Sequence, residues 1–385
     1  MGEPRPRLRV AVLFGGESAE HEVSLQSALN VVQAMDPEKY EILLIGVDKR
    51  GRWHLADSAR FLLDAADPQR IRLAEGGGSL GLLPGRDSEK LVSMGGGARP
   101  PVVAEGLPEG TLDVVFPVLH GPMGEDGSVQ GLLQLAHLPC VGSGILGSAI
   151  GMDKEVAKRL LLQAGVPVPR FVTLRRGTRA PAGFDDLAER LGLPFFLKPA
   201  NMGSSVGVHK VHARGEFEEA LEDAFSFDRK VLAEEFIDGR ELECAVLGNE
   251  EPIASVPGEV VPLHEFYSYE AKYLDEEGAR LEIPARLSAA TVGLVQELAL
   301  QTFRVLECEG MARVDFFLRE SGDLLVNEVN TIPGFTRISM YPKLWEASGI
   351  GYPELIDRLL RLALERAERD RDRRSSVELV PDEAD

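Results

Sequence analysis

One stretch decides the fold: Met311-Ala-Arg313-Val-Asp315-Phe-Phe-Leu, the turn Ser321-Gly-Asp, and Leu324-Leu-Val-Asn-Glu328-Val-Asn330. Charged and apolar residues alternate in both runs, and a turn containing glycine joins them, so the sequence predicts a β-hairpin. The polar side chains expected together on one face of it are Arg313, Asp315, Glu328 and Asn330.

Three of these side chains offer oxygen ligands beside a guanidinium group. Carboxylate and carbonyl oxygens suit Mg²⁺, which proteins usually share with substrate phosphates instead of caging it alone. The pattern therefore indicates phosphate chemistry. The same alternation is also typical of a solvated sheet face, on which Asp315 and Glu328 would hold no ligand.

The size and charge of the chain limit what it can be. Its 385 residues allow two or three domains with their own cores, and a hydrophobic content of 44% is that of a globular protein. A formal net charge of −20 repels nucleic acid and anionic membranes, so we expect neither as a partner. An anionic substrate would need a local cluster of positive side chains.

The cysteines and the N-terminus indicate a cytoplasmic protein. Cys140, Cys244 and Cys308 are widely separated, have no metal-ligand spacing and lie among apolar neighbours, as reduced core residues do. The basic segment 1–9 precedes only a short strand, so we expect neither a secretory signal nor a membrane span.

Apolar runs and glycine turns predict an N-terminal domain with a parallel sheet, because strands and helices alternate there. We expect the glycine-rich stretches 75–85 and 94–110 to be surface loops or a weakly ordered insertion. The expected elements are strands at 8–14, 40–47 and 112–119, a helix at 22–35 after the turn Gly15-Gly16, and a helix that ends at 136.

A second domain is expected after a helix at 152–163 and the rigid linker Val166-Pro-Val-Pro169. The predicted boundaries give an N-terminal domain at 1–145, a central α+β domain at 146–239 and a C-terminal domain at 240–385. The expected elements are strands at 171–174, 195–198, 206–211 and 231–237, and helices at 185–191, 216–224, 288–306 and 353–366, with a frayed end from 368.

A loop of small residues, Lys198-Pro-Ala-Asn-Met-Gly203-Ser204-Ser205-Val-Gly207, joins two of the central strands. Its exposed N–H groups and hydroxyls could close over a polyphosphate, although an ordinary glycine hairpin would have the same composition. Lys198 ends an apolar run, where a cation is costly unless an anion pairs with it. Lys154 and Lys272 are further candidates for binding phosphate, and solvation is their alternative.

The carboxylates around Glu234-Glu235-Phe236-Ile237-Asp238-Gly239-Arg240-Glu241 could accept hydrogen bonds from an adenine amino group and from ribose hydroxyls. Glu22 opens the first helix after the glycine turn, where the helix dipole favours a carboxylate. It could bind an ammonium group or simply cap the helix. His120 ends a strand before Gly121, a place where a lone histidine is more often structural.

The order of these motifs resembles that of the ATP-grasp enzymes, and within them the D-alanine–D-alanine ligases, from about residue 9 to 366. The resemblance implies a three-domain ATP-grasp fold. The matching segments are Gly15-Gly-Glu-Ser-Ala-Glu-His-Glu22-Val-Ser-Leu, His120-Gly-Pro-Met-Gly-Glu-Asp-Gly127, 198–207, Glu270-Ala-Lys-Tyr273, Arg313-Val-Asp315 and 328–339.

Ligases of this family join two D-alanines through a D-alanyl phosphate, with ATP as substrate, two Mg²⁺ ions for which Mn²⁺ can substitute, and a role in peptidoglycan precursor synthesis. The resemblance also implies a cytoplasmic homodimer. By motif position it assigns ATP binding to Lys154, Lys198, Ser204, Ser205, Glu234, Phe236, Ile237, Glu241 and Lys272, and metal binding to Asp315, Glu328 and Asn330.

For the two amino-acid substrates, the resemblance implies that Glu22, Ser204 and Tyr273 hydrogen-bond to one another and close the site. It assigns the oxyanion to Arg313 and the N–H of Gly334. The residues it places at the substrates are Glu22, His120, Arg313, Ser339 and Met340. The Lys272-Tyr273 pair favours an amine over a hydroxy acid as the second nucleophile.

Three other classes compete with this interpretation. The strand before Gly15-Gly16 is also found in dinucleotide-binding domains, but the third spaced glycine is missing and Asp48 is the nearest acidic candidate. An ATP-grasp ligase for other substrates would share the nucleotide residues and differ at Glu22, Tyr273 and Ser339. A catalytically inactive relative would be expected to have lost metal ligands, and here all three are present.

Overall fold

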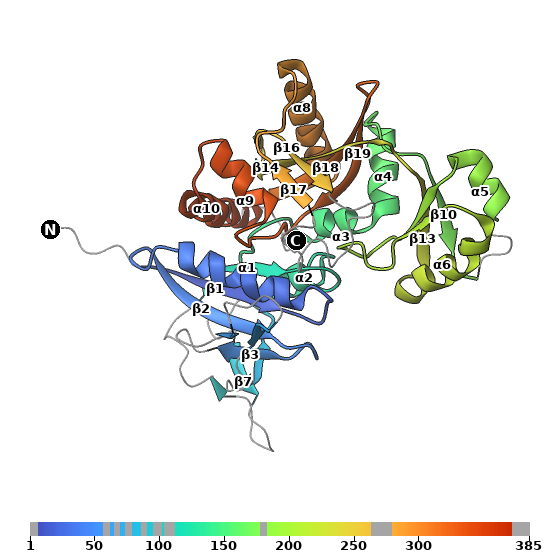
Figure 1. Cartoon of the computed structure of the whole chain (residues 1–385). Helices are drawn as coiled ribbons and strands as arrows, with labels where there is room; N and C mark the ends of the chain where they lie inside the picture. Colours follow the sequence, from blue (N-terminus) through green and yellow to red (C-terminus); the bar gives the residue numbers. More distant parts are fainter. Residues whose placement is uncertain are drawn as a thin grey trace, which may run out of the picture.

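The structure, a computed structural model, describes residues 7–56, 62–64, 70–73, 79–85, 91–94, 102–103, 112–177, 183–262 and 279–371. Its three main sheets follow one another along the chain, in the segments 8–119, 171–235 and 239–330 (Figure 1). The sheets therefore change between residues 119 and 171 and between residues 235 and 239. The predicted boundaries after 145 and 239 stay predictions as domain limits.

The N-terminal sheet has seven strands in the order β8-β7-β6-β3-β2-β1-β9, of which β2, β1 and β9 are parallel. This confirms a parallel sheet for these three strands, while β3, β6, β7 and β8 extend it in antiparallel pairs. The strands are β1 (Leu8–Gly15), β2 (Tyr40–Val47), β3 (Trp53–Ala56), β6 (Ser79–Leu82), β7 (Leu91–Met94), β8 (Val102–Val103) and β9 (Val114–Leu119), and a separate pair is formed by β4 (Leu62–Leu63) and β5 (Arg72–Leu73).

The prediction of a loop at 75–85 was wrong, because β6 lies within it and pairs with β3 and β7. Glycines dilute the apolar pattern of this stretch, and Leu80 alone among its strand residues is buried. Pairing with two neighbouring strands supplies the order that the local sequence does not indicate. Likewise, β8 falls inside the stretch 94–110.

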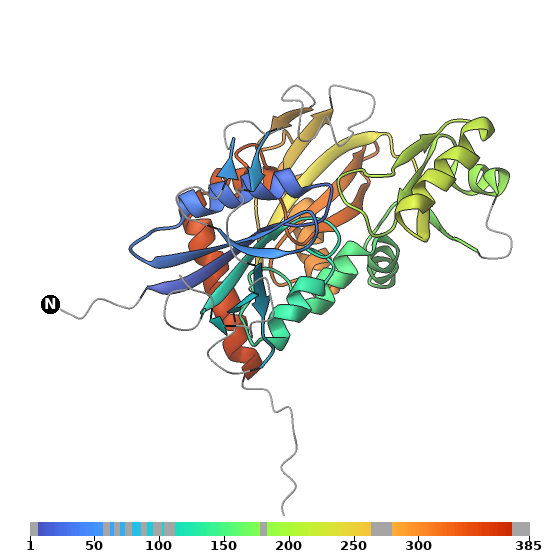
Figure 2. The same ribbon diagram turned by 90° about the horizontal axis from the view of Figure 1, so that it is seen from below.

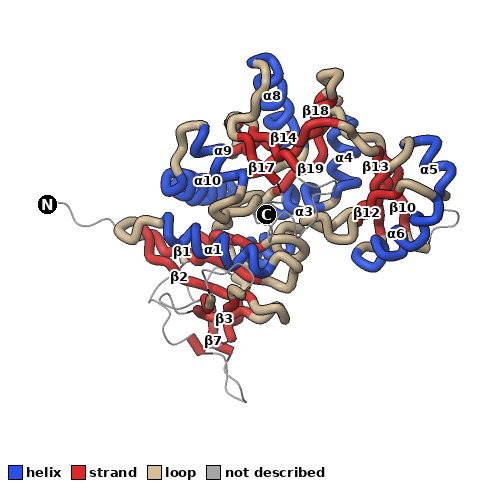
Figure 3. Tube along the Cα trace, in the orientation of Figure 1, coloured by secondary structure: helices blue, strands red, loops and turns tan. Residues whose placement is uncertain are grey.

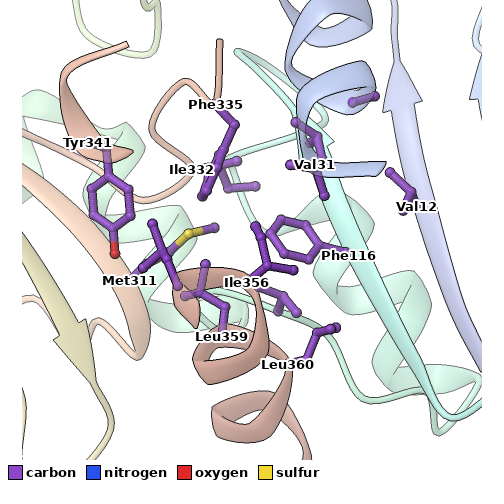
Figure 4. Close-up of a cluster of buried hydrophobic side chains, with 14 of the residues drawn as sticks. Val12, Val31, Phe116, Met311, Ile332, Phe335, Tyr341, Ile356, Leu359 and Leu360 are labelled. Atoms are coloured by element: carbon purple, nitrogen blue, oxygen red, sulfur yellow. The ribbon is translucent and has the colours of Figure 1, made fainter. Parts of the chain in front are cut away.

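Alternation along β1 divides the first domain into two cores. Val10, Val12 and Phe14 face α1 (His21–Ala34), while Ala11 and Leu13 face the opposite side, where α2 (Ser128–Leu135) packs. The first of these cores continues into the C-terminal domain. Figure 4 shows Val12, Val31 and Phe116 together with Phe335, Ile356 and Leu360 of the C-terminal part.

The central sheet is antiparallel in the order β10-β13-β11-β12, and two helices cover one of its faces (Figure 3). The strand predicted at 206–211 corresponds to β12, which is shorter and begins at His209. The elements are β10 (Phe171–Arg175), β11 (Phe195–Pro199), β12 (His209–Val211), β13 (Lys230–Glu235), α5 (Phe184–Leu191) and α6 (Arg214–Phe227).

The C-terminal sheet runs β17-β16-β14-β18-β19, with β15 paired to β14. One face packs on α8 and α4, and the other belongs to the core shared with the N-terminal domain. The elements are α4 (Lys154–Gln163), β14 (Gly239–Gly248), β15 (Ile253–Ala254), β16 (Gly258–Pro262), β17 (Ala279–Glu282), α8 (Ala289–Val305), β18 (Gly310–Arg319) and β19 (Leu324–Asn330).

Two short helices were not predicted, α3 (Ile145–Met152) and α9 (Met340–Ala347). Pro342 lies in the first turn of α9, where the missing N–H needs no partner, so it does not break the helix. The closing helix α10 (Tyr352–Arg371) extends five residues beyond the predicted end at 366. No helix among the described residues is long and apolar enough to cross a membrane.

The domains are joined by α10, which lies against α1 and β9 (Figures 1 and 2). Near its end, the buried guanidinium of Arg366 donates to the carbonyl oxygens of Gly142 and Cys140, and forms an ion pair with Glu309 at 3.5 Å. Buried carbonyl groups without a donor are costly, so this side chain stabilises the contact between the domains.

Arg366→Met should therefore lower the melting temperature by several degrees, because it leaves two buried carbonyls unsatisfied at about 1–3 kcal/mol each. Scanning calorimetry provides the measurement. Arg361→Met on the same helix is the matched control, since Arg361 is exposed, and it should change the melting temperature little. Equal effects of the two variants would contradict this account of the interdomain contact.

Candidate active site

The β-hairpin predicted at 311–330 forms from strands β18 and β19. In β18 and β19, Arg313 pairs with Asn330 and Asp315 with Glu328, so all four side chains lie on one face. The guanidinium of Arg313 donates from Nε and Nη2 to the two oxygens of Asp315, both at 2.7 Å, and Asn330 Nδ2 donates to Asp315 at 3.0 Å. A β-bulge after Asp315 shifts the register at this point, as bulges next to active sites often do.

A further carboxylate, Glu243, was missed by the sequence analysis. It lies on β14 directly opposite Asp315, and its Oε2 is 2.8 Å from Arg313 Nε. The sequence feature that indicates Glu243 is the alternation Glu241-Leu-Glu243. It puts both glutamates on the same face as the polar side chains of the hairpin. Arg313 is therefore held between two carboxylates.

Asp315, Glu328 and Asn330 supply a donor set that fits Mg²⁺, namely two carboxylates and one amide oxygen. Among the described residues, no group of three or more His, Cys, Asp or Glu side chains is arranged to hold a metal ion. A cation at the hairpin would therefore need oxygen ligands from elsewhere. Substrate phosphates are the usual source for Mg²⁺.

The structure brings Lys154 to this hairpin. Its Nζ lies 3.3 Å from Glu328 Oε2 and donates to the carbonyl oxygen of Met202 at 2.7 Å. Met202 belongs to the loop 200–208 between β11 and β12, which the sequence predicts to close over phosphate and which is called the flap from here on. One cation therefore connects the hairpin of β18 and β19 with the flap.

Lys198 also points into the site, where it donates to Glu234 Oε1 at 2.5 Å. The apolar run before Lys198 predicts an anion beside this lysine, and that anion is Glu234. A second lysine, Lys158 of α4, was missed; its Nζ is 2.8 Å from Glu234 Oε2. Burial alone would raise the pKa of Glu234, but the two ammonium groups bring that pKa below its usual value.

The flap contains two strained residues. Ser204 and Ser205 have φ angles of 50° and 60°, in the left-handed region that residues with a Cβ seldom occupy. Ser204 Oγ donates to Glu20 Oε1. Gly203 also lies near Glu20, because an added Cβ there would be 3.2 Å from Glu20 Oε2. The flap is thus closed onto the N-terminal domain through Glu20.

The prediction that Glu22 binds Ser204 was wrong. Glu22 instead accepts a hydrogen bond from Lys49 Nζ at 2.6 Å. Burial would raise the pKa of Glu22, and the Lys49 contact brings it below the usual range. The reason is helix geometry: Glu20 is the N-cap of α1 and faces the flap, while Glu22, inside the first turn, points elsewhere. Both glutamates match the expected pattern, so the sequence alone does not separate them.

Two side chains of the N-terminal domain form hydrogen bonds with the backbone of Ile332. His120 Nδ1 lies 3.1 Å from the Ile332 carbonyl oxygen, and Glu125 Oε1 accepts from the Ile332 N–H at 3.3 Å. Burial lowers the pKa of His120, which favours the neutral ring. With Nδ1 donating to Ile332, Nε2 is the acceptor nitrogen, and it is buried with no hydrogen-bond partner among the described residues. Glu125 was not singled out by the sequence analysis.

Ile332 precedes the loop of Gly334 and Ser339. An added Cβ on Gly334 would lie 2.7 Å from Ser339 Oγ, so a side chain there would displace the serine hydroxyl. Ser339 Oγ accepts from the Thr336 N–H at 3.0 Å, and Ser339 is the N-cap of α9, which begins at Met340. The N-terminus of this helix offers N–H groups to an anion.

The remaining predicted residues lie at the edge of the site or outside the described residues. Ile237 is buried, whereas Phe236 is 38% exposed. The ring centroids of Phe236 and Phe196 are 6.2 Å apart. Glu241 lies on β14, on the same face as Glu243. Lys272 and Tyr273 fall in the segment 263–278, outside the described residues.

An antiparallel sheet whose serine turn closes toward an acidic hairpin, beside an N-terminal parallel sheet, defines an ATP-grasp enzyme. The family models that match are the D-ala D-ala ligase N-terminus at residues 9–143 and the D-ala D-ala ligase C-terminus at residues 160–361. The chain belongs to the D-alanine–D-alanine ligase family.

Individual relatives support this assignment. The chain is 52% identical to a D-alanine–D-alanine ligase of Oceanobacillus iheyensis, over 96% of this chain and 98% of the relative. A solved D-alanine–D-alanine ligase of Coxiella burnetii is 37% identical, with a TM-score of 0.80 over 95% of this chain and 96% of that one. The VanG D-Ala:D-Ser ligase of Enterococcus faecalis is 35% identical, with a TM-score of 0.79 over 93% and 100%.

Glu125 gives the site a testable pH dependence. Burial, and then the charge of Glu20, raise its pKa from 4.5 to about 8. The folded chain therefore keeps a proton that the unfolded chain releases above pH 4.5, and this contribution to stability is lost as the pH rises from about 4.5 to about 8.

Glu125→Gln should remove this slope. The melting temperature of the variant minus that of the wild type should increase between pH 5.5 and 8, by several degrees, because each pKa unit is worth about 1.4 kcal/mol. Scanning fluorimetry at matched ionic strength measures it. Glu22→Gln, at a partly exposed group, is the control, and a constant difference for Glu125→Gln would refute the assignment.

Proposed function

We propose that this enzyme ligates two D-alanines with ATP, through a D-alanyl phosphate, to form D-alanyl-D-alanine for peptidoglycan precursors. One observation carries the proposal: a single site contains a closed serine flap on Glu20, lysines Lys154 and Lys198, and the Arg313–Asp315 hairpin. Groups suited to nucleotide and to amino-acid substrates therefore lie in one site.

The first D-alanine would bind between α1 and the hairpin. Its ammonium group would pair with the buried carboxylate of Glu20, which replaces Glu22 in this role. Its carboxylate would then face Arg313 and attack the γ-phosphorus of ATP, so that a carboxyl–phosphate bond forms as the bond to ADP breaks. His120, with a buried acceptor nitrogen, would line the same pocket.

The nucleotide would bind between the central and C-terminal sheets. Lys154 and Lys198 would neutralise its inner phosphates, and Ser204 and Ser205 would close the flap over them. Glu234 and Glu241 would accept from adenine and ribose, with backbone groups of Phe236 and Ile237 beside the ring. Lys272 would reach the γ-phosphate.

Asp315, Glu328 and Asn330 would hold two Mg²⁺ ions, or Mn²⁺ in their place, together with the phosphates. The ions supply positive charge that offsets the charge of the transferring phosphoryl group. In the described structure, Arg313 and Asn330 occupy the oxygens of Asp315. These contacts orient the carboxylate until ligands arrive.

In the second step, the amine of the other D-alanine attacks the acyl phosphate and phosphate leaves. Arg313 and the N–H of Gly334 would stabilise the oxyanion, where fixed donors act most strongly. Ser339 Oγ and the Met340 N–H, at the start of α9, would bind the second carboxylate. Tyr273, which lies outside the described residues and which the resemblance assigns to the closure of the site, would help to exclude water and to favour an amine nucleophile.

The homodimer and the cytoplasmic location that the sequence suggests stay proposals. Sedimentation of the purified chain with and without ADP would give the number of subunits. A sedimentation coefficient of a monomer under both conditions would rule out the homodimer.

The experiment that tests the function supplies purified enzyme with ATP, Mg²⁺ and D-alanine, and measures ADP together with the product by mass spectrometry. We expect one ADP per dipeptide, no reaction with L-alanine, and amide instead of ester when D-lactate competes. Asp315→Asn is the paired variant; its kcat should fall by at least about a hundredfold, which is about 2.7 kcal/mol, while its circular dichroism is unchanged. Hydrolysis of ATP independent of D-alanine would contradict the proposal.

The two glutamates of α1 allow a matched comparison. Glu20→Gln should lower kcat/KM for D-alanine by about 10–100-fold, because a hydrogen bond to a charged group contributes about 1.5–3 kcal/mol. Glu22→Gln should stay within about threefold of the wild type, since Glu22 pairs with Lys49 at the surface. The reverse ranking would return the role to Glu22.

A further inference from the structure

Glu234 is a carboxylate with only 1% of its side chain exposed, yet two ammonium groups approach it from different elements. Lys198 of β11 donates to Oε1 at 2.5 Å, and Lys158 of α4 lies 2.8 Å from Oε2. A buried carboxylate needs one cation to balance its charge. The second cation therefore requires an explanation.

The two lysines differ in how firmly they are held. The side chain of Lys198 is 13% exposed, and that of Lys158 only 2%. Lys158 Nζ also donates to the carbonyl oxygen of Asn327 in β19 at 2.9 Å, which fixes it from a second side. Lys198 contacts Asn327 only through a long bond of 3.4 Å to its amide oxygen. Lys198 is thus the one that can move toward a ligand.

Binding of a nucleotide would give Lys158 and Lys198 different roles. Under the proposed function, Lys198 turns toward phosphate, and Glu234 must then stay ionised without its closer partner. Lys158 is the cation that remains. Because each carboxylate oxygen has two lone pairs, Glu234 can keep the Lys158 contact and still accept a hydrogen from a ligand.

We propose that Lys158 is a positioning residue that holds Glu234 as a fixed anion and thereby makes the nucleotide site selective for a purine with a 6-amino group. The inference rests on the proposed contact of Glu234 with adenine. A 6-amino group donates to an anionic carboxylate, whereas a 6-oxo group presents a second acceptor to it and is rejected. A 6-oxo purine would leave the buried carboxylate of Glu234 without a donor. A site built to hydrogen-bond one substrate group discriminates strongly against an analogue that lacks this group.

The charges around Glu234 agree with this role. Burial lowers the pKa of Lys158, and Glu234 first and Glu328 of β19 to a lesser degree oppose that change. Lys158 and Lys198 are the cations that bring the pKa of Glu234 down against its burial. Glu235, next in the strand, faces the other side, where it binds Arg170 and Arg319.

The test compares ATP with inosine triphosphate, which carries a 6-oxo group in place of the 6-amino group. In Lys158→Met, we expect KM for ATP to rise at least tenfold with kcat within about threefold. The ratio of kcat/KM for ATP to that for inosine triphosphate should fall at least tenfold. An unchanged ratio would overturn the proposal.

Lys230→Met is the matched control. Lys230 is also a buried lysine, 8% exposed, and pairs with Asp153 and Glu155 away from Glu234. Its replacement should lower the melting temperature as replacement of Lys158 does, while the nucleotide ratio stays at the wild-type value. A loss of the ratio in both variants would mean that general destabilisation explains the effect, and would also overturn the proposal.

Glu234→Gln and the double variant Lys158→Met/Glu234→Gln keep the proposal testable if Lys158→Met does not fold. The double variant removes both charges and should fold at least as well as Lys158→Met. It should show the same reduced selectivity as Glu234→Gln, because Lys158 acts through Glu234. If the double variant lost more selectivity for ATP than Glu234→Gln alone, Lys158 would not act through Glu234, which would contradict the proposal.

Binding of ADP and inosine diphosphate, measured by calorimetry, separates this inference from the proposed reaction. If the wild type formed no dipeptide but still preferred ADP, and Lys158→Met removed that preference, the reaction would be wrong and the inference right. If dipeptide formed and Lys158→Met kept the preference, the inference alone would fail.

Discussion

The strict alternation of β18 is the constraint on which the rest of the structure depends. Ala312, Val314 and Phe316 face α8 and form the core of the C-terminal domain. Arg313 and Asp315 necessarily face the other side, because successive side chains of a strand point to opposite faces. Burial of the apolar set therefore fixes the direction of the polar set, and a slip of one residue would exchange them.

The same face joins the apolar core of the N-terminal domain at one end of the strand. Met311 lies in that core, together with Phe335 and Tyr341 (Figure 4). The loop that carries Gly334 is consequently held from two sides, by packing of Phe335 and by the contacts of His120 and Glu125 with Ile332. The active site is placed by the interdomain core, and residues from both terminal domains reach it.

Charge within the site is balanced by pairing. In a chain with a net charge of −20, three cations of the described site are already paired: Lys154 with Glu328, Lys198 with Glu234, and Arg313 with Asp315 and Glu243. An anionic ligand would exchange one negative partner for another, so the site does not need to leave buried cations uncompensated. Buried lysines that are fixed, such as Lys158, then differ in function from those that can move.

The sequence by itself determined the elements with strong periodicity and the side chains they present together. The hairpin of Arg313, Asp315, Glu328 and Asn330 is local, so its register follows from alternation and a short turn. Tertiary structure alone decided what depends on distant segments. Glu20 rather than Glu22 meets Ser204 because the flap comes from another sheet, and β6 exists because its neighbours pair with it. The roles of Lys158 and Glu125 depend on partners far along the chain, namely Glu234 and the N–H of Ile332. Alternation places Glu243 on the polar face, but only the tertiary structure shows its contact with Arg313.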